Sequence, residues 1–378
     1  MNFYSSVILL LTMTLELLKP QRESFDDLKS IPNLMHTCLF YGPKDIRYEK
    51  VETPKIKDDE ILVKVKAALT CGTDLKTYER GHPVLIKSTP SSFGHQFSGI
   101  VADVGRNVNS FKINQRVVAV NTAPCFECTF CKKEKFSLCE NIEFLNGAYA
   151  EYVAIPERIV KYNTYEIPTG IDFEQAALLE SLSVVLHGVD RSGIKKNKTV
   201  CIIGTGSIGL LFAALSKHKG AKVISIGRNN FKLQIAKELG ADHILNVSEI
   251  DDLEKCIKDL TDGVGPEIVI EAVGVPETWE LATRLVTRGG LVNFFGGCKR
   301  GTKIEIDTYR LHYDELNLIG VFHHTPKCVH AALELLKDTS FSDMLVKKII
   351  THTINLSQLE KAFLLHQLGK AIQVAVKP

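Results

Sequence analysis

The stretch Thr199–Arg228 constrains the fold of this chain more than any other. It opens with the apolar run Val200–Ile203, which is short enough for a buried strand. Three glycines at G-x-G-x-x-G spacing follow, and apolar residues then recur at helical spacing until Gly220. A second apolar run, Lys222–Ile226, predicts another strand. This order of strand, glycine turn, helix and strand predicts a dinucleotide-binding unit rather than an ordinary glycine-rich turn.

Each glycine of this loop has a physical role in such a unit. The first glycine makes the tight turn, the second lets the backbone approach a pyrophosphate, and the third lets the helix pack closely on the strand. The N-terminus of the helix then offers free N–H groups and a positive dipole end to the phosphates. The cofactor-binding residues predicted in this loop are Gly204, Thr205, Gly206, Ser207, Ile208 and Gly209.

The end of the second strand bears on the choice of nicotinamide cofactor. In dinucleotide folds an acidic residue about 20 positions past the glycines hydrogen-bonds the ribose 2′-OH. Gly227 stands where that acid would be, and no Asp or Glu follows before Glu238. Arg228 offers a planar fork that matches phosphate oxygens, and Lys232 adds a second positive charge one helical turn further on. The sequence therefore predicts NADP(H) in preference to NAD(H). The alternative is a solvated Arg228 and a cofactor held through its pyrophosphate alone.

The chain has two regions of different pattern on either side of about residue 186. With 378 residues it is long enough for two domains with separate cores. Before residue 186, short strands separated by Gly, Pro and Asn turns predict an all-β, barrel-like region. Beyond it, strands alternate with helices, which predicts a parallel, doubly wound sheet. The tail after residue 322 has no further strand–helix repeat, so we expect it to return to the first region.

In the alternating region, three more helices and four more strands are expected after the opening unit. The expected helices are Phe231–Leu239, Leu253–Leu260 and Glu277–Val286. The expected strands are His243–Leu245, Glu267–Ala272, Leu291–Phe295 and Leu316–Val321. In the tail we expect a helix at Val329–Leu336 and a last strand near Ile372–Val376.

Residues 1–34 continue neither pattern. Val7–Met13 is apolar, but no basic residue precedes it and no small-residue cleavage site follows, so a secretory signal is not expected. No apolar run approaches the roughly 20 residues of a membrane helix. A formal net charge of +2 gives no basic field, which argues against nucleic acid as a partner. We therefore expect a dispensable extension before Met35, and a cytoplasmic protein without membrane or nucleic-acid partners.

Four cysteines follow a C-x2-C-x2-C-x7-C pattern on one short stretch: Cys125, Cys128, Cys131 and Cys139. Four thiolates on one loop suit a closed tetrahedral zinc site. An iron–sulfur cluster is the functional alternative, but the second copy, the trailing Cys-Pro and the ferredoxin spacing are missing. Four unliganded surface thiols this close would oxidise. The pattern therefore predicts structural zinc in a reducing compartment.

Cys71 and His95 are candidate ligands of a different kind. Each stands beside a glycine at the end of a predicted short strand. A catalytic zinc needs about three protein ligands and one open position. A single cysteine and a single histidine are also ordinary core residues. Taken alone, these two residues leave both interpretations open.

Five motifs follow one another along the chain: Cys71-Gly72-Thr73-Asp74, Gly94-His95-Gln96-Phe97-Ser98-Gly99, the four-cysteine loop, Glu180-Ser181-Leu182-Ser183 and Gly204–Gly209. Their order resembles that of the zinc-containing medium-chain dehydrogenase/reductase family, within the alcohol dehydrogenase superfamily. The resemblance runs from Met35 to Pro378 and looks closest to the polyol (sorbitol-like) and threonine dehydrogenase branch. It implies an α/β protein with a GroES-like β-barrel catalytic domain plus a Rossmann doubly wound parallel sheet. The implied division is an extension (1–34), a catalytic domain (35–185), a dinucleotide-binding domain (186–322) and a C-terminal return to the catalytic domain (323–378).

The resemblance also implies the site residues. In that branch a glutamate from an E-P-L-S stretch joins the cysteine and the histidine around the metal, which points to Glu180 beside Cys71 and His95. Thr73 would accept the substrate's hydroxyl proton and pass it outward, although a strand-end threonine also commonly bonds to backbone. The catalytic residues implied are thus Cys71, Thr73, His95 and Glu180. Two zinc ions per chain are expected.

Three positions depart from the family pattern. Gln96 stands where the family usually has glutamate, and an amide cannot supply an anionic oxygen. Ser181 replaces the usual proline, and Lys76 stands at the position of a relay histidine. Glu180 is therefore the expected anionic ligand, and a proton relay through Lys76 is not expected.

The function implied is hydride transfer between a secondary alcohol of polyol, sugar or cyclitol type, or its ketone, and a nicotinamide cofactor. Zinc would polarise the alcohol oxygen, and the hydride chemistry belongs to the cofactor. A threonine 3-dehydrogenase-like enzyme is the alternative within the family. A non-catalytic zinc- and dinucleotide-binding protein is the alternative outside enzymes, whereas a zinc-independent quinone reductase would lack the Cys71 and His95 pair. A homodimer or homotetramer is expected.

Overall fold

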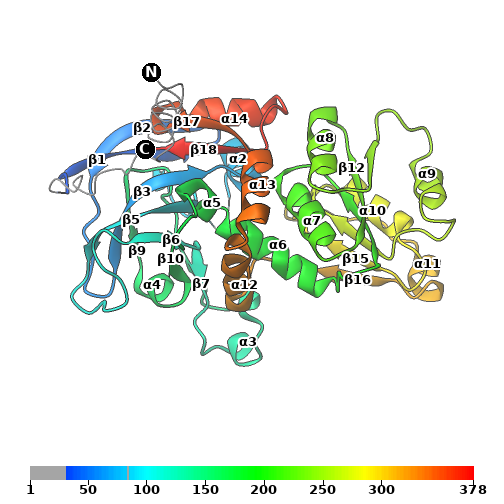
Figure 1. Cartoon of the computed structure of the whole chain (residues 1–378), viewed down its shortest axis with the longest axis horizontal. Helices are drawn as coiled ribbons and strands as arrows, with labels where there is room; N and C mark the ends of the chain where they lie inside the picture. Colours follow the sequence, from blue (N-terminus) through cyan, green and yellow to red (C-terminus); the bar gives the residue numbers. More distant parts are fainter. Residues whose placement is uncertain (1–30, 83–84) are drawn as a thin grey trace, which may run out of the picture. The chain divides into compact units, whose positions relative to one another are not determined.

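The glycine loop belongs to a six-stranded parallel sheet. The computed structural model describes residues 31–82 and 85–378. The strands are β11 (Thr199–Ile203), β12 (Lys222–Gly227), β13 (His243–Asn246), β14 (Ile268–Glu271), β15 (Leu291–Phe294) and β16 (Asn317–Gly320). They follow the order β13-β12-β11-β14-β15-β16, and every neighbouring pair is parallel (Figure 1). This is the strand order of a doubly wound dinucleotide-binding fold.

Helices cover both faces of this sheet. They are α6 (Leu179–Arg191), α7 (Ser207–His218), α8 (Asn230–Glu238), α9 (Leu253–Asp259), α10 (Pro276–Leu285), α11 (Thr308–Tyr313) and α12 (Pro326–Leu336). Val200 and Ile202 join one buried cluster with residues of α6, α7 and α12, whereas Cys201 and Ile203 join another with residues of α9 and α10. Side chains alternate across a strand, so a strand buried on both faces is apolar throughout. The helices and strands predicted between residues 231 and 321 are confirmed to within one residue at each end.

The first region consists of antiparallel strands, as its pattern predicts. They are β1 (Leu34–Gly42), β2 (Asp45–Glu52), β3 (Ile61–Leu69), β4 (Ser91–Ser92), β5 (Gln96–Val104), β6 (Arg116–Ala119), β7 (Thr122–Ala123), β8 (Glu143–Phe144), β9 (Tyr152–Ile155) and β10 (Thr164–Glu166). Strand β3 pairs with β5 over most of its length and also with β9. A separate apolar cluster, which includes Phe40, Phe97, Tyr149 and Phe363, fills the space between these strands.

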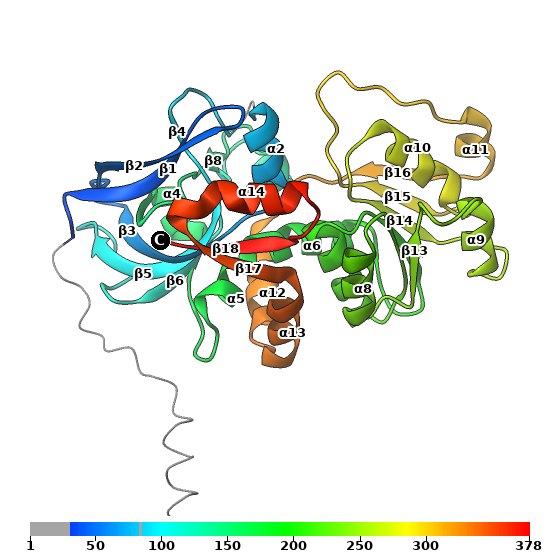
Figure 2. The ribbon, with the colours of Figure 1, turned by 90° about the horizontal axis from the view of Figure 1, so that it is seen from above.

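The end of the chain joins the sheet of the first region. Its elements are α13 (Thr339–Ile349), β17 (Ile350–Asn355), α14 (Leu359–Gln367) and β18 (Gln373–Lys377). Strand β18 runs antiparallel to β3, with Ala375 opposite Leu69. Helix α14 contacts both β17 and β18 (Figure 2). The last strand of the chain is thus hydrogen-bonded to β3.

Several helices of the first region were not predicted, because short strands dominate its sequence pattern. They are α2 (Gly72–Arg80), α3 (Thr129–Lys132), α4 (Glu157–Asn163) and α5 (Phe173–Ala177). Helix α6 was not predicted either, although polar residues recur along it at helical spacing; nearly all of it from Leu179 to Val189 is buried. The predicted boundary between residues 185 and 186 falls inside this helix. The domain limits given above stay predictions.

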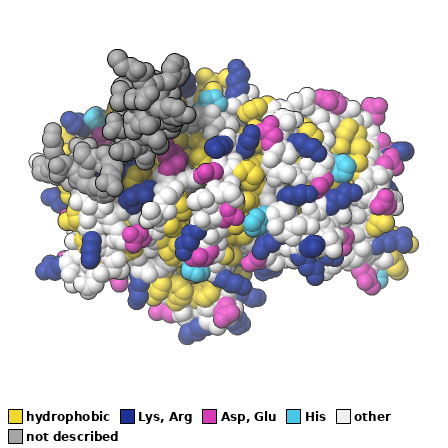
Figure 3. Space-filling view, viewed as in Figure 1, with side chains coloured by type: hydrophobic (Ala, Val, Ile, Leu, Met, Phe, Trp, Pro, Cys, Tyr) yellow, Lys and Arg dark blue, Asp and Glu magenta, His cyan; other side chains and the backbone are white. Residues whose placement is uncertain are grey.

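Of the predicted extension 1–34, residues 1–30 lie outside the described residues, whereas Leu34 already belongs to β1. No helix of the described part of the chain has both the length and the apolar character that spanning a membrane requires. Basic and acidic side chains are interspersed over the described part of the face in Figure 3. That face therefore presents no large patch of a single charge.

Candidate metal and cofactor sites

Three neighbouring strands bring the candidate ligands to one edge of the sheet. Strand β3 lies between β5 and β18 and runs antiparallel to both. Leu69, the last residue of β3, stands opposite Gln96, the first residue of β5. Cys71 comes just after β3 and His95 just before β5, so the two meet at this edge although 24 positions separate them in the chain.

Cys71 and His95 form a buried donor pair. Cys71 Sγ and His95 Nε2 lie 3.5 Å apart, and both side chains are buried. A thiolate and an imidazole nitrogen on one tetrahedral zinc, at about 2.3 and 2.0 Å, would lie about 3.5 Å apart. The pair therefore has the spacing of two ligands of one zinc ion.

Asp74 orients both members of this pair. One of its oxygens, Oδ1, lies 3.0 Å from His95 Nδ1, which leaves the Nε2 atom of that ring directed at Cys71. The other oxygen accepts hydrogen bonds from the backbone N–H of Cys71 and the hydroxyl of Tyr149, each at 2.9 Å. The donor atoms of Cys71, Asp74 and His95 lie within 4.8 Å of one another. Because both Asp74 oxygens are already bonded, its carboxylate fixes the ligands rather than serving as one.

The electrostatics of the pair favour a cation between its two donors. Burial raises the pKa of the Cys71 thiol, and the Asp74 carboxylate adds to the rise. Burial by itself would lower the pKa of His95, but the charges of Asp74 and Cys71 raise it well above its usual value. Zinc ligands must be a thiolate and a neutral imidazole, and a divalent ion compensates the buried thiolate. The residues present therefore fit a zinc ion.

Glu180 reaches the same edge from the first turn of α6. Its side chain is 8% exposed, and burial raises the pKa of its carboxyl. Oε2 accepts a hydrogen bond of 2.7 Å from Gln96 Nε2. Among residues 31–82 and 85–378, no donor is paired with its other oxygen, Oε1. Glu180 does not belong to the compact donor cluster around Cys71 and His95. It therefore has one oxygen fixed by Gln96 and one available.

Thr73 and Lys76 lie on α2, which begins directly after Cys71. The Thr73 side chain is half-buried, and its hydroxyl has no hydrogen bond within the described part of the chain. Lys76 Nζ donates to the carbonyl of Val273 at 3.4 Å, and burial lowers its pKa. The lysine is thus engaged with the end of β14, while the threonine hydroxyl is available for a substrate.

The four cysteines converge around the short helix α3. Their sulfur atoms all lie within 4.8 Å of one another. Cys125 Sγ is 3.4 Å from Cys139 Sγ and 3.9 Å from Cys131 Sγ, and none of the four forms a disulfide. Sulfur ligands of one tetrahedral zinc, each bound at about 2.3 Å, lie about 3.8 Å apart. Backbone N–H groups lower the pKa of Cys128 to about 6, which favours a thiolate. The donor set fits a closed zinc site.

The glycine loop has the geometry that a pyrophosphate requires. Gly204 has a φ of +111°, which favours glycine, and a Cβ on Gly209 would stand 1.9 Å from the carbonyl oxygen of Gly204. A Cβ on Gly206 would meet nothing within 4 Å. Helix α7 begins at Ser207 with no side chain capping its first N–H groups. Those groups remain available for an anionic ligand.

The end of β12 holds the residues predicted to choose the cofactor. A Cβ on Gly227 would lie 2.6 Å from Thr205 Oγ1, so Thr205 fills the space that an acidic side chain there would need. Arg228 is exposed and forms no hydrogen bond or ion pair among the described residues. Lys232 is half-buried, and burial lowers its pKa. The guanidinium of Arg228 is therefore available to a ligand of the loop.

Three residues were not predicted at the edge of the sheet where Cys71 and His95 meet, which we call the metal edge. Asp74 lies inside a motif noted above, but spacing does not reveal that it faces His95. Tyr149 and Gln373 come from distant segments, and only the sheet register brings them here. No signal in the sequence marks Gln373.

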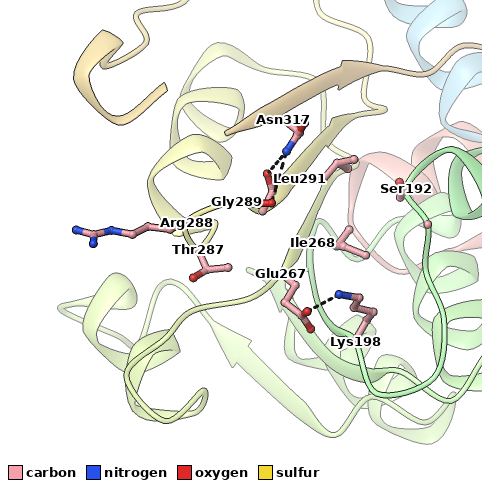
Figure 4. Close-up of a pocket in the computed structure, with 11 residues that line it drawn as sticks. Ser192, Lys198, Glu267, Ile268, Thr287, Arg288, Gly289, Leu291 and Asn317 are labelled. Carbon is pink, nitrogen blue, oxygen red and sulfur yellow. Dashed lines mark hydrogen bonds and ion pairs between the residues drawn. The ribbon is translucent and has the colours of Figure 1, made fainter. Parts of the chain in front are cut away.

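A separate pocket lies at the opposite edge of the parallel sheet. Figure 4 shows residues of this pocket, which lie at the N-terminal ends of β14, β15 and β16. Its volume is about 280 Å³. An ion pair of 2.6 Å between Lys198 and Glu267 lines one side of it. The glycine loop follows the C-terminal end of β11, so this pocket includes none of the predicted site residues.

Comparisons with known proteins agree with this arrangement. The alcohol dehydrogenase GroES-like domain matches residues 57–164, and the zinc-binding dehydrogenase domain matches residues 207–338. A sorbitol dehydrogenase of Bacillus subtilis is 30% identical over 88% of this chain and 94% of its own length. An L-threonine 3-dehydrogenase of the same organism is 32% identical over 87% of this chain and 94% of its own length. The crystal structure of a zinc-binding dehydrogenase from Sinorhizobium meliloti bound to NADP matches this structure with a TM-score of 0.82. The two sequences are 30% identical, and the match covers 92% of this chain and 100% of the other.

These findings define the class of the protein as a zinc-dependent oxidoreductase acting on alcohols with a nicotinamide cofactor. The chain belongs to the zinc-containing medium-chain dehydrogenase/reductase family, in the branch that holds the polyol and threonine dehydrogenases. Its fold, a GroES-like β region with a doubly wound parallel sheet, is the one that the resemblance implied.

Proposed function

We propose that this protein oxidises a secondary hydroxyl of a polyol, sugar or cyclitol, and reduces the corresponding ketone, with NADP(H) as the preferred cofactor. The observation that carries the proposal is the 3.5 Å pair of Cys71 and His95 with Asp74 behind the imidazole. The similarity to a sorbitol dehydrogenase supports a polyol substrate. The similarity to an L-threonine 3-dehydrogenase makes threonine oxidation the second candidate.

Cys71, His95 and Glu180 would hold the catalytic zinc. A thiolate and a carboxylate supply two negative charges, which balance a divalent ion next to a neutral imidazole. When bound there, zinc supplies Lewis acidity that polarises the alcohol oxygen. Asp74 keeps the His95 ring in the tautomer whose Nε2 can ligate. Glu180 would contribute its Oε1, the oxygen that Gln96 does not occupy.

Thr73 would manage the substrate's hydroxyl proton. It lies two positions beyond Cys71, and its hydroxyl has no partner within the described part of the chain. It can accept the hydrogen bond of the substrate hydroxyl and donate its own proton outward. Lys76 is held by the carbonyl of Val273, which supports the view that it does not act as the relay.

The choice between a polyol and threonine rests on the similarity to the relatives of each kind. His323 and His324 do not decide it, because the Nε2 atoms of both imidazoles lie within hydrogen-bond distance of the Thr122 hydroxyl. The test is kcat/KM for a panel of polyols, sugars, cyclitols and L-threonine; a preference for threonine would select the second candidate.

The NADP preference rests on the exposed guanidinium of Arg228 beside Gly227. One charge-assisted contact to a 2′-phosphate, worth roughly 1.5–3 kcal/mol, changes the cofactor ratio ten-fold or more. We expect Arg228→Ala to lower the ratio of kcat/KM with NADP to that with NAD by at least that factor. Arg191→Ala is the matched control, since Arg191 is an exposed arginine at the end of α6. A wild-type preference for NAD, or an unchanged ratio in Arg228→Ala, would contradict the assignment.

Cys125, Cys128, Cys131 and Cys139 would hold a second, structural zinc ion. Their sulfur spacings support zinc, and the seven residues before Cys139 and the Glu140 after it depart from the ferredoxin pattern. Elemental analysis of the purified protein should give two zinc ions per chain. One zinc ion, or iron in its place, would contradict this.

We also propose a cytoplasmic homo-oligomer, either a dimer or a tetramer. All ten cysteines are free, as expected in a reducing compartment. Strand β16 is an edge of the described parallel sheet, and Phe322 just beyond it is 60% exposed. Light scattering coupled to size-exclusion chromatography would measure the mass, and a monomer at micromolar concentration would contradict the proposal.

A further inference from the structure

The two departures from the family motif at the metal edge touch one another. Gln96 Nε2 donates to Ser181 Oγ at 2.8 Å as well as to Glu180 Oε2 at 2.7 Å. A second glutamine, Gln373 of β18, donates from its Nε2 to Gln96 Oε1 at 3.0 Å and to Ser181 Oγ at 3.4 Å. These four side chains are between 0% and 8% exposed. They form one buried polar network with a single carboxylate.

The partners fix the direction of both amides. Gln96 must present its nitrogen to the Glu180 carboxylate, because that group is only an acceptor when ionised. Gln96 Oε1 therefore faces Gln373, which must present its nitrogen in turn. The cost is that Gln373 Oε1 is buried with no hydrogen-bond partner among the described residues. Reversing the Gln373 amide would set its carbonyl oxygen against that of Gln96.

We propose that Gln96, Ser181 and Gln373 form a neutral clamp that positions Glu180, so that one carboxylate oxygen is held and the other faces the metal. This rests on the proposed role of Glu180 as the anionic zinc ligand. Gln373 comes from the last strand of the chain, so the clamp makes the C-terminal segment part of the metal site. Gln96 and Gln373 are positioning residues, since they act on the metal only through Glu180.

The neutrality of the clamp follows from the charges around it. Cys71, Glu180 and Asp74 already place three acidic groups at this edge, against one divalent ion. A carboxylate at position 96 would lie in direct hydrogen-bond contact with that of Glu180. That carboxylate would be a fourth acidic group at this edge, which one divalent ion would not balance. The clamp holds Glu180 by hydrogen bonds alone and adds no charge to the centre.

The clamp is tested by substitutions that keep volume but remove one donor. Gln373→Met should lower kcat at least ten-fold and weaken zinc binding at the catalytic site at least ten-fold in competition with a chelator. It should also shift the visible absorption of the Co²⁺-substituted enzyme, which reports the ligand geometry. Gln175→Met is the matched control, because Gln175 is a buried glutamine that bonds to Asp343 and, among the described residues, forms no hydrogen bond to Cys71, His95 or Glu180. It should leave the Co²⁺ spectrum and the zinc affinity unchanged.

A charge exchange tests the neutrality of the clamp independently of packing. Gln96→Glu should lower kcat/KM at least ten-fold, because it sets two carboxylates side by side. Adding Gln373→Lys should restore most of that loss, since the ammonium would stand where the amide nitrogen donates. If Gln373→Met leaves zinc affinity and the Co²⁺ spectrum unchanged in an active enzyme, the clamp is wrong. A wild-type protein without zinc or turnover would instead contradict the proposed function.

Discussion

The four-cysteine loop and the centre formed by Cys71, His95 and Glu180 bring their candidate zinc ligands together in opposite ways. The loop takes four sulfurs from 15 consecutive positions, Cys125–Cys139, around a helix of one turn. The other centre takes its groups from β3, β5, α2 and α6, which the sheet register and helix packing bring together. In the first case a metal would organise the chain, and in the second the folded chain would organise a metal. We call the second site, with Cys71, His95 and Glu180, the dispersed centre. Loss of a ligand should therefore lower the stability of the fold at the four-cysteine loop, but lower the rate of turnover at the dispersed centre.

The largest expected effect is on turnover at the dispersed centre. Cys71→Ser replaces the thiolate by a hydroxyl, a poor zinc ligand, and should lower kcat/KM by at least about 10³-fold, or about 4 kcal/mol of transition-state stabilisation. The fold should persist, because the sheet around it needs no metal. Steady-state kinetics and circular dichroism measure the two together. An unfolded Cys71→Ser protein would show that the two centres do not differ as argued.

Cys128→Ser should give the converse result. Removing one of four ligands should release the structural zinc and lower the free energy of unfolding by roughly 2–4 kcal/mol, since metal binding in such a loop stabilises the fold. Turnover per folded molecule should remain within a few-fold of wild type. Denaturant unfolding and zinc content would be compared with the serine variant of Cys256, a cysteine outside both centres.

The same contrast explains what could be predicted from the sequence. The glycine loop and the four cysteines are contiguous, so spacing alone predicts them. The alternating strands and helices are also local, and their limits were predicted closely. Cys71 and His95 needed a family resemblance, because only the antiparallel register of β3 and β5 makes them neighbours. Gln373 could not be predicted at all, since nothing in its local pattern places it beside Gln96.

Asp74→Asn sharpens the comparison at the dispersed centre. The amide keeps the size of the side chain but weakens the hold on His95 Nδ1, so the imidazole is a poorer and less oriented ligand. We expect a 10–100-fold loss of zinc affinity or activity, in line with such partners of metal-bound histidines. The four-cysteine zinc should be retained, which elemental analysis would show as one ion per chain. Loss of both ions together would mean that the centres are coupled.

In the glycine loop, Thr205 lies so close to Gly227 that a side chain at position 227 would contact it. Gly227→Asp supplies the acid that favours NAD, but its Cβ would lie 2.6 Å from Thr205 Oγ1. The single variant should therefore bind both cofactors about ten-fold less well, since the loop must shift. Gly227→Asp with Thr205→Gly should recover binding and favour NAD. Dissociation constants for NADP and NAD measure this, and a single variant that already binds NAD normally would contradict the coupling.

The smallest effect concerns a titrating group beside the dispersed centre. A ring nitrogen of His366, on α14, lies 2.7 Å from the hydroxyl of Thr70. Burial is the main reason that the pKa of His366 is lowered to about 4, and the charge of Lys232 lowers it further. The charge of Asp74 raises this pKa, and His352 lowers it slightly. The folded state therefore stays unprotonated at a pH where the unfolded chain, with a pKa of about 6.5, takes up a proton. This contribution to stability is present above pH 6.5 and is lost as the pH falls toward 4. Between pH 7.5 and 5.5 it amounts to about 1 kcal/mol. In His366→Gln the amide nitrogen replaces Nε2 at Thr70. This variant should lose less unfolding free energy between pH 7.5 and 5.5 than the wild type, by this amount. If the unfolding free energy depends on pH equally in both proteins, His366 titrates alike in the folded and unfolded states.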